Sequence, residues 1–295
     1  MNLLLDPFHY EFMQRALVVC VLLGFTNGFL GSFVVLRRLA LLADALSHSL
    51  LPGIATAAIF LGLSTPAMLV GGLLAALIVA VGGQLISRSS RLKDETAIAS
   101  LYIVAFALGI ILIKYARVKV DLSHFLFGNI LAVGDVDLWL AYGVSAVTLL
   151  SLLALQRPLL ISLFEPSVAK TLGIRVEALL LWLTVLIVLV MVASLQTVGV
   201  LLSLGMLILP AATIYLLTDS YQFMLWASGA LGAVGALVGL WLSFCLNIPS
   251  GPTIVLVLGL AFVLAYLFGP KYGIVSRARR TRHLHQESLA RWSEH

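Results

Sequence analysis

Long apolar stretches alternate with short polar segments along most of this chain. A helix of about 20 apolar residues crosses the hydrocarbon core of a bilayer. On this criterion the sequence predicts nine membrane spans, or eight if one stretch does not cross. They lie near residues 13–36, 41–61, 66–87, 97–114, 137–156, 177–195, 198–217, 224–246 and 252–269. The predicted fold class is an all-α, polytopic integral membrane helical bundle, forming a single transmembrane domain over residues 1–273.

The composition supports the same fold class. Hydrophobic residues make up 61% of the 295 positions and charged residues 11%, with a mean hydropathy of +1.11, whereas a typical soluble domain is about 25% charged. Cys20 and Cys245 lie inside apolar stretches and are expected to act as small hydrophobic residues. The first residues lack the basic segment and cleavage site of a signal peptide, so the first span is expected to remain in the mature protein.

The basic residues indicate orientation rather than a nucleic-acid ligand. The net charge is +5, but Lys and Arg fall at the ends of the apolar stretches, where the positive-inside rule places them. An external N-terminus with a cytoplasmic C-terminus satisfies this rule best. The basic residues that then remain outside are Arg15, Lys114, Arg117 and Lys119.

One apolar segment, residues 124–135, is too short to cross and is predicted to be a re-entrant or interfacial helix. His124 stands at its edge close to Asp121, where a solvated loop end is a simpler interpretation than a metal site. The same holds for the histidines of residues 274–295. These residues form a basic cytoplasmic tail, which we expect to lie against anionic lipid headgroups.

The stretch from Leu39 to Gly53 places an acid and a histidine in the middle of apolar sequence. On a helix Asp44 and His48 lie one turn apart on the same face, so both side chains can bind one ligand. Pro52 has no N–H to donate to the His48 carbonyl, so the helix is expected to kink there and leave this oxygen free. Two simpler roles remain open: Asp44 as a helix N-cap, and His48 as a hydrogen-bonded core histidine.

An ionisable pair inside a bilayer is costly and usually functional. One carboxylate and one imidazole form an incomplete metal site, but two copies of the chain on a two-fold axis would supply two of each. Such a set suits Zn²⁺, Mn²⁺ or Fe²⁺, whereas Ca²⁺ and Mg²⁺ prefer oxygen ligands alone. We therefore predict a homodimer in which Asp44 and His48 bind a transported metal ion on the axis, with no permanently bound cofactor.

Glycine and proline indicate how the spans pack. Gly24 with Gly28, and Gly235 with Gly239, form GxxxG pairs, a spacing that lets helix backbones approach closely in lipid. Pro210 lies inside the seventh span and is expected to break or kink it, as Pro52 does the second. Two such kinks suggest helices that move.

Residues 163–176 are predicted to form a short amphipathic cytoplasmic helix, because Glu165 stands near its start and Gly173 at its end. Its apolar side carries Val168, Ala169 and Leu172. Such a face suits insertion into a groove on another protein. From the residues alone, a bare connector is an equally good interpretation.

Several enzyme signatures are absent from the sequence. No lysine follows a glycine, so the GxxxxGK[ST] phosphate loop cannot be present and the chain is not expected to hydrolyse ATP by itself. The HExxH motif of zinc proteases and the GxSxG motif of serine hydrolases are missing too. The chain is therefore not expected to be an enzyme.

Five strings of the sequence carry a family resemblance. The most specific is DALSHSLLPG at residues 44–53. The others are SRSSRLKDETAI (87–98), FEPSVAKTLGI (164–174), VGVLLSLGMLILPAAT (198–213) and PSGPTIVL (249–256). Together they resemble the permease subunits of bacterial ABC importers for manganese, zinc and iron, from near the N-terminus to the last span.

The resemblance implies a multi-pass protein of the bacterial inner membrane that pairs with a second copy and binds two cytoplasmic ATPases. A periplasmic or lipid-anchored metal-binding protein would deliver the ion. Asp44 and His48 would line the metal path, and residues 163–176 would form the coupling helix seated in the ATPase. The coupling residues would be Glu165, Ala169, Leu172 and Gly173.

Other classes remain possible on the sequence alone. In a proton-coupled secondary metal transporter or a channel, Asp44 and His48 would relay protons without an ATPase. A scaffold would explain the spans but not the buried acid. Nitrogen and oxygen ligands do not separate manganese from zinc. Both are therefore expected ions, and iron is the second choice.

Overall fold

The computed structural model describes residues 10–62, 64–115, 130, 133–270, 273 and 274. Within these residues the chain is helical and forms no strand, so the all-α prediction is confirmed. The helices are α1 (Glu11–Leu36), α2 (Ala40–Ser49), α3 (Leu51–Leu61), α4 (Thr65–Ser89), α5 (Asp94–Tyr115), α7 (Asp135–Ala154), α8 (Gln156–Phe164), α9 (Pro166–Thr171), α10 (Val176–Val198), α11 (Val200–Leu217), α12 (Tyr221–Leu246) and α13 (Ser250–Phe268).

Nine helical stretches of the described chain are long and apolar enough to cross a membrane. Each overlaps one of the nine predicted spans and differs from it by a few residues at its ends. The second span consists of α2 and α3 together, whereas α8 and α9 are too short to cross. The hydropathy pattern therefore located every span in the described residues.

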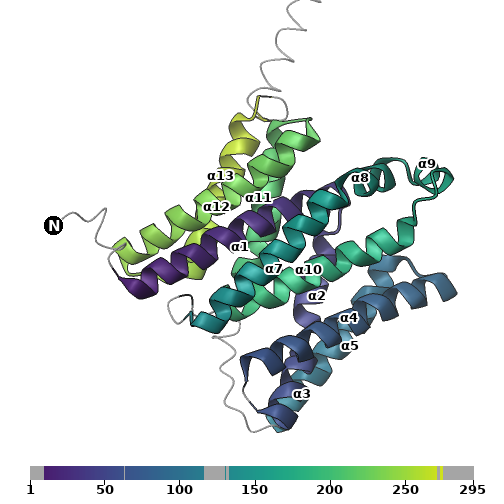
Figure 1. The fold of residues 1–295 in the computed structure, drawn as a ribbon, viewed down its shortest axis with the longest axis horizontal. Helices are drawn as coiled ribbons and strands as arrows, with labels where there is room; N and C mark the ends of the chain where they lie inside the picture. Colours follow the sequence, from purple (N-terminus) through teal and green to yellow (C-terminus); the bar gives the residue numbers. More distant parts are fainter. Residues whose placement is uncertain (1–9, 63, 116–129, 131–132, 271–272, 275–295) are drawn as a thin grey trace, which may run out of the picture.

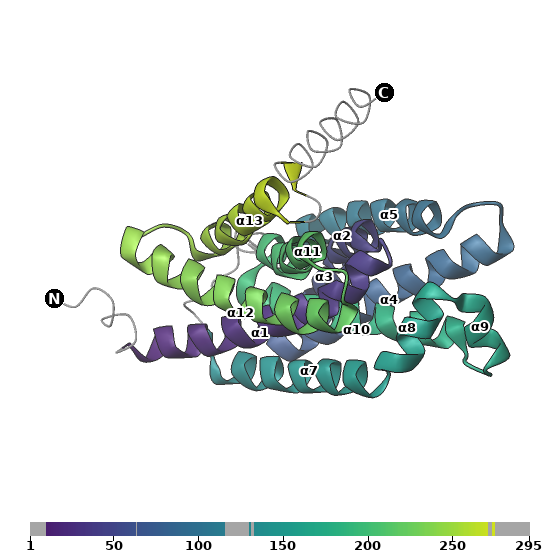
Figure 2. The same ribbon diagram turned by 90° about the horizontal axis from the view of Figure 1, so that it is seen from above.

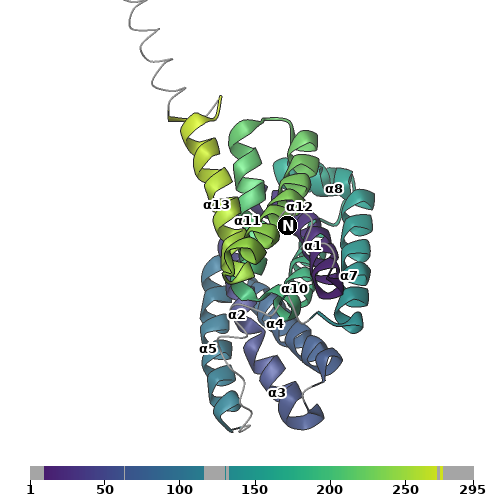
Figure 3. The same cartoon turned by 90° about the vertical axis from the view of Figure 1, so that its left-hand side faces the viewer.

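The spans form two groups joined by central helices (Figures 1 and 3). Helices α2 to α5 pack on one another in one group, and α11 to α13 in the other. Helices α1 and α10 contact members of both groups, and Asn27 of α1 donates a buried hydrogen bond of 3.0 Å to the hydroxyl of Ser194 on α10. Figure 2 shows α7 on one side of the bundle and α5 with α13 on the opposite side.

Glycines set the closest helix contacts, as the GxxxG pairs predicted. A Cβ atom on Gly24 would lie 2.6 Å from the carbonyl oxygen of Gly232, so α1 and α12 touch through their backbones. Gly235 and Gly239, on another face of α12, would meet side chains of α13. Without a hydrophobic driving force between helices in lipid, such close packing is a main source of helix association.

Helix α11 continues through Pro210, from Val200 to Leu217, so the proline does not break this helix. The kink expected at Pro210 stays a prediction. Pro210 is buried, and its ring packs near Gly232 of α12. A proline removes one backbone hydrogen bond, and in a membrane bundle the neighbouring helices hold the helix together around it.

Charged side chains identify the two ends of the bundle. At the end that carries α8 and α9, Arg88 of α4 pairs with Glu177 of α10 at 3.1 Å. At the opposite end, Arg15 of α1 pairs with Asp135 of α7 at 2.7 Å. Most basic residues of the described loops lie at the α8–α9 end, which is the end that the positive-inside rule predicts to be cytoplasmic.

Two predicted segments fall largely or wholly outside the described residues. The short apolar segment at 124–135 is described only at residue 130 and from residue 133 onward, and the basic tail lies beyond residue 274. The predictions for these segments and their histidines stay predictions.

Candidate functional site

The predicted metal ligands lie on α2, the short first half of the second span. Asp44 and His48 stand one turn apart, and the helix ends at Ser49. After Leu50 the chain resumes as α3, with Pro52 in its first turn. The interruption thus falls just before the proline. The His48 carbonyl is not left free, however, because it accepts the backbone N–H of Leu50, so that part of the prediction is wrong.

The structure excludes the two simpler roles for this pair. Asp44 lies inside α2, whose N-cap is Leu39, so it is not a capping residue. The side chain of His48 is 34% exposed and that of Asp44 is 49% exposed in the single chain. Neither is a sequestered core group. Both side chains are reachable from outside the folded chain while lying within a membrane span.

The spacing of the two ligand atoms fits one shared ion. His48 Nε2 lies 3.8 Å from Asp44 Oδ1, which is too long for a hydrogen bond. Two ligands of a tetrahedral zinc ion at 2.0–2.2 Å lie about 3.3–3.6 Å apart, so a shift of a few tenths of an ångström brings both atoms within reach of an ion of this kind. Among the described residues, no group of three or more His, Cys, Asp or Glu side chains forms a complete site.

Helix α5 supplies the second wall of the site. The ring of Tyr102 stacks on His48 with centroids 6.4 Å apart, and Phe106 meets the same imidazole edge-on at 5.3 Å. A cavity of about 330 Å³ between α2 and α5 is lined by Asp44, Tyr102 and Glu95, among others. The acid Glu95 lies in the first turn of α5.

None of these α5 residues was predicted from the sequence. Glu95, Tyr102 and Phe106 lie on one face of the helix, seven and four residues apart. This spacing is visible in the sequence, but nothing in the sequence states that the face packs against α2.

Two glycines bring the neighbouring helices against the interruption in the second span. Gly109 of α5 faces the backbone of Leu51 and Pro52, and Gly53 of α3 faces the carbonyl of Gly71 on α4. Gly53 closes the DALSHSLLPG string, so the structure gives this position a packing role. The glycines therefore help to place α5 and α4 beside the second span, which carries Asp44 and His48.

The predicted coupling segment, residues 163–176, runs from the last turn of α8 through α9 to the start of α10. Val168 in α9 and Leu172, which directly follows it, are 46% and 63% exposed, whereas Ala169 is fully buried. Ala169 therefore packs within the chain and does not belong to an exposed coupling face. Glu165 occupies the N-cap position of α9, and Gly173 ends the segment with φ of 76°, a left-handed conformation that suits glycine.

An arginine connects this segment to the start of α2, the helix that carries Asp44 and His48. Arg37, which directly follows α1, donates a hydrogen bond of 3.3 Å to the carbonyl of Ser162 on α8. Partial burial lowers the pKa of Arg37 from its ordinary value. The next residue, Arg38, has φ of 58°, and α2 begins two residues later at Ala40. The α1–α2 turn and the α8–α9 segment are therefore in direct contact.

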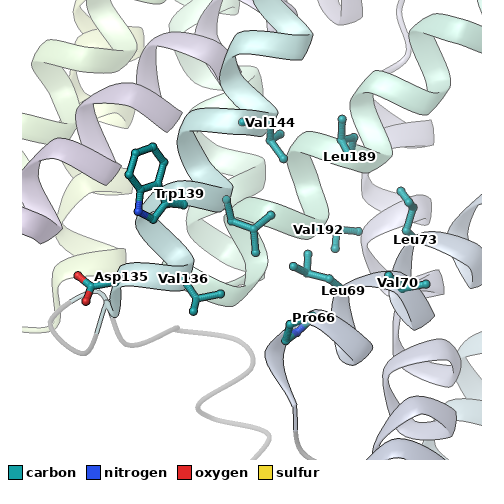
Figure 4. Close-up of a pocket in the computed structure, with 12 residues that line it drawn as sticks. Pro66, Leu69, Val70, Leu73, Asp135, Val136, Trp139, Val144, Leu189 and Val192 are labelled. Carbon is teal, nitrogen blue, oxygen red and sulfur yellow. The ribbon is translucent and has the colours of Figure 1, made fainter.

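A separate cleft lies between α4, α7 and α10 (Figure 4). Its volume is about 730 Å³, and its walls are apolar side chains such as Leu69, Trp139 and Val192. Among the described residues that line it, Asp135 is the only one with a charged side chain, and it pairs with Arg15. These residues thus offer no set of ligands for a cation.

Known proteins resemble this chain over nearly its whole length. The manganese transport system membrane protein MntC of Listeria monocytogenes is 40% identical over 272 residues, which cover 92% of this chain and 95% of the relative. The manganese import system permease protein ScaB of Streptococcus parasanguinis is 40% identical over 267 residues, covering 90% and 93%. A relative from Haemophilus influenzae, whose name refers to an iron transport system, is 34% identical over 280 residues, covering 95% and 98%.

A solved structure has the same fold. A chain of "PsaBC from Streptococcus pneumoniae in complex with Fab" matches with a TM-score of 0.81 at 37% identity, covering 91% of this chain and 96% of that one. The model of the ABC 3 transport family matches residues 9–269, which include α1 to α13. The chain is therefore a member of the ABC 3 transport family, a multi-pass permease of the bacterial plasma membrane.

Proposed function

We propose that this chain is the membrane subunit of an ATP-driven importer of manganese, in which Asp44 and His48 bind the ion midway across the membrane. The observation that carries the proposal is the 3.8 Å spacing of the two ligand atoms on one face of a membrane-embedded helix. Relatives of similar length are named for manganese transport. Zinc and iron remain alternatives for the transported ion, because the same ligands accept them.

The chain acts as a homodimer in this proposal. One copy supplies a carboxylate and an imidazole, which is too few for a stable site, and both side chains are partly exposed in the single chain. A second copy related by a two-fold axis would complete the set. Coexpression of differently tagged wild-type and Asp44→Ala chains tests this arrangement. Mixed dimers purified through both tags should fail to bind manganese; wild-type binding by the mixed dimers contradicts the shared site.

Separate ATPases drive the cycle by alternating access. The exposed Val168 and Leu172 of α9 provide an apolar contact for an ATPase groove, and the chain lacks a phosphate loop of its own. Closure of the ATPases would move α8 and α9 and open the Asp44 and His48 site to one side at a time. An external metal-binding protein would deliver the ion to the opposite end.

Acid should inhibit uptake. Carboxylate and imidazole must be deprotonated to bind a metal, so the site loses affinity as protons compete with the ion. The rate of uptake at limiting manganese should therefore fall as the external medium is acidified. At saturating manganese the decrease should be smaller.

The decisive experiment measures uptake of radioactive manganese in cells that lack their own importers. Wild type and His48→Ala are compared with and without the cognate ATPase, and copurification checks that the variant still binds the ATPase. Uptake that requires the ATPase and is lost in His48→Ala supports both the class and the site. Uptake without the ATPase favours a secondary transporter, in which Asp44 and His48 relay protons.

A further inference from the structure

Within the described residues, His48 lacks the hydrogen bond that usually fixes the ring orientation of a metal-binding histidine. Such a ring normally donates a hydrogen bond from its second nitrogen to a carboxylate, a carbonyl or water, which sets its orientation. In the part of the chain that the structure describes, no protein group makes a hydrogen bond to the His48 imidazole. The protein contacts that can orient this ring near Asp44 are therefore packing contacts.

Two aromatic rings of α5 make that contact. Tyr102 lies on the imidazole with an angle of 27° between the ring planes, and Phe106 meets it at 75°. Stacked and edge-to-face arrangements are the favourable geometries for such pairs. The two rings stand one helical turn apart, so they restrict the tilt of the imidazole from two directions.

Tyr102 has a second contact that Phe106 lacks. It lines the cavity of about 330 Å³ that also exposes Asp44, so one side chain borders both members of the ligand pair. Gly109 lies two turns further along the same face of α5 and permits close approach to Leu51 and Pro52. The position of Tyr102 is thus fixed by helix packing next to the site.

We propose that Tyr102 is a positioning residue for metal transport, whose ring holds the His48 imidazole toward Asp44. This inference rests on the proposed function, because it requires Asp44 and His48 to bind the ion. The contact involves the ring face, so the ring and not the phenolic hydroxyl orients the imidazole. Removing the ring leaves both ligands present but poorly oriented.

The test measures manganese uptake by cells carrying the complete importer, over a range of manganese concentrations. The variants are Tyr102→Ala, Tyr102→Leu and Tyr102→Phe, with His48→Ala as the site variant. Tyr142→Ala is the matched control, because it removes a partly exposed tyrosine ring from α7, where the ring contacts Trp139 and not His48. The ATPase activity of each purified complex is measured alongside.

Loss of the ring should raise the KM for manganese by about tenfold, the lower end of the effect of orienting partners on metal affinity. The maximal rate and the basal ATPase activity should change little in Tyr102→Ala and Tyr102→Leu. Tyr102→Phe and Tyr142→Ala should behave as wild type. Leucine keeps apolar bulk at the position, so agreement between the Ala and Leu variants separates orientation from loss of packing.

Other outcomes overturn the inference in distinguishable ways. If His48→Ala abolishes uptake while both ring-removing variants keep the wild-type KM, the metal site stands and the positioning role is wrong. A Tyr102→Phe variant as impaired as Tyr102→Ala would assign the effect to the hydroxyl. A fall in maximal rate and ATPase activity at unchanged KM would indicate a structural role only. Normal uptake by His48→Ala would refute the proposed site and this inference together.

Discussion

Substitution of Gly109 by alanine tests the packing that places α5 against the second span, which carries Asp44 and His48. A Cβ atom at this position would lie 2.8 Å from the backbone nitrogen of Pro52 and 3.0 Å from the Cβ of Leu51. Ordinary van der Waals contact begins at 3.4 Å. The helix α5 and the α2–α3 junction must therefore separate by about 0.6 Å in Gly109→Ala.

The expected loss of stability follows from two opposing terms. Overpacking costs about 1–3 kcal/mol, and replacing a helical glycine by alanine recovers up to about 1 kcal/mol. The net destabilisation should be about 1 kcal/mol. Gly143→Ala and Gly259→Ala are matched controls, because a methyl group there meets nothing within 4 Å. These controls gain the higher helix propensity of alanine without the overpacking cost, so they should be more stable than Gly109→Ala by about 2 kcal/mol.

Thermal unfolding of the purified complex in lipid nanodiscs, at one scan rate, measures this difference. At about 2–4 °C per kcal/mol for a protein of this size class, Gly109→Ala should unfold about 4–8 °C below the two controls. The same displacement carries the aromatic rings away from His48, so the KM for manganese should rise in Gly109→Ala alone. Equal unfolding temperatures and equal KM values in all three variants would show that α5 does not approach Pro52 closely.

Three further predictions concern other parts of the chain. Glu95→Gln should lower uptake several-fold at limiting manganese, because the acid shares the cavity of Asp44. Glu177 is an exposed acid at the same end, and Glu177→Gln should leave uptake unchanged. Equal uptake by both variants would remove Glu95 from the metal path. Leu172→Glu should weaken copurification of the ATPase without changing unfolding temperature, because it alters an exposed apolar side chain; unchanged copurification would exclude that contact. Arg37→Ala should lower the free energy of unfolding by about 1 kcal/mol, because the Ser162 carbonyl loses a charged donor; denaturation showing no loss would make that hydrogen bond unimportant.

Hydropathy and residue spacing were sufficient to predict the membrane spans, the common face of Asp44 and His48, and a close helix contact through glycine. The nine spans followed from stretch length, because a bilayer sets the minimum length of a crossing helix. The common face of Asp44 and His48 followed from helical periodicity alone. Glycine pairs predicted backbone contact, and Gly24 makes it with α12. Pro210 does not break α11, because neighbouring helices in a bundle support a helix that contains proline, and the kink expected there stays a prediction.

The tertiary structure alone decided which faces of the helices meet. It placed Tyr102 beside His48 and buried Ala169 in the α9 segment, and it joined Arg37 to Ser162 across 125 positions of sequence. The physical reason is that lipid is as apolar as a helix interface. A membrane helix can therefore be apolar on every side, and its sequence marks that it is buried in the bilayer without marking which neighbour each face will contact.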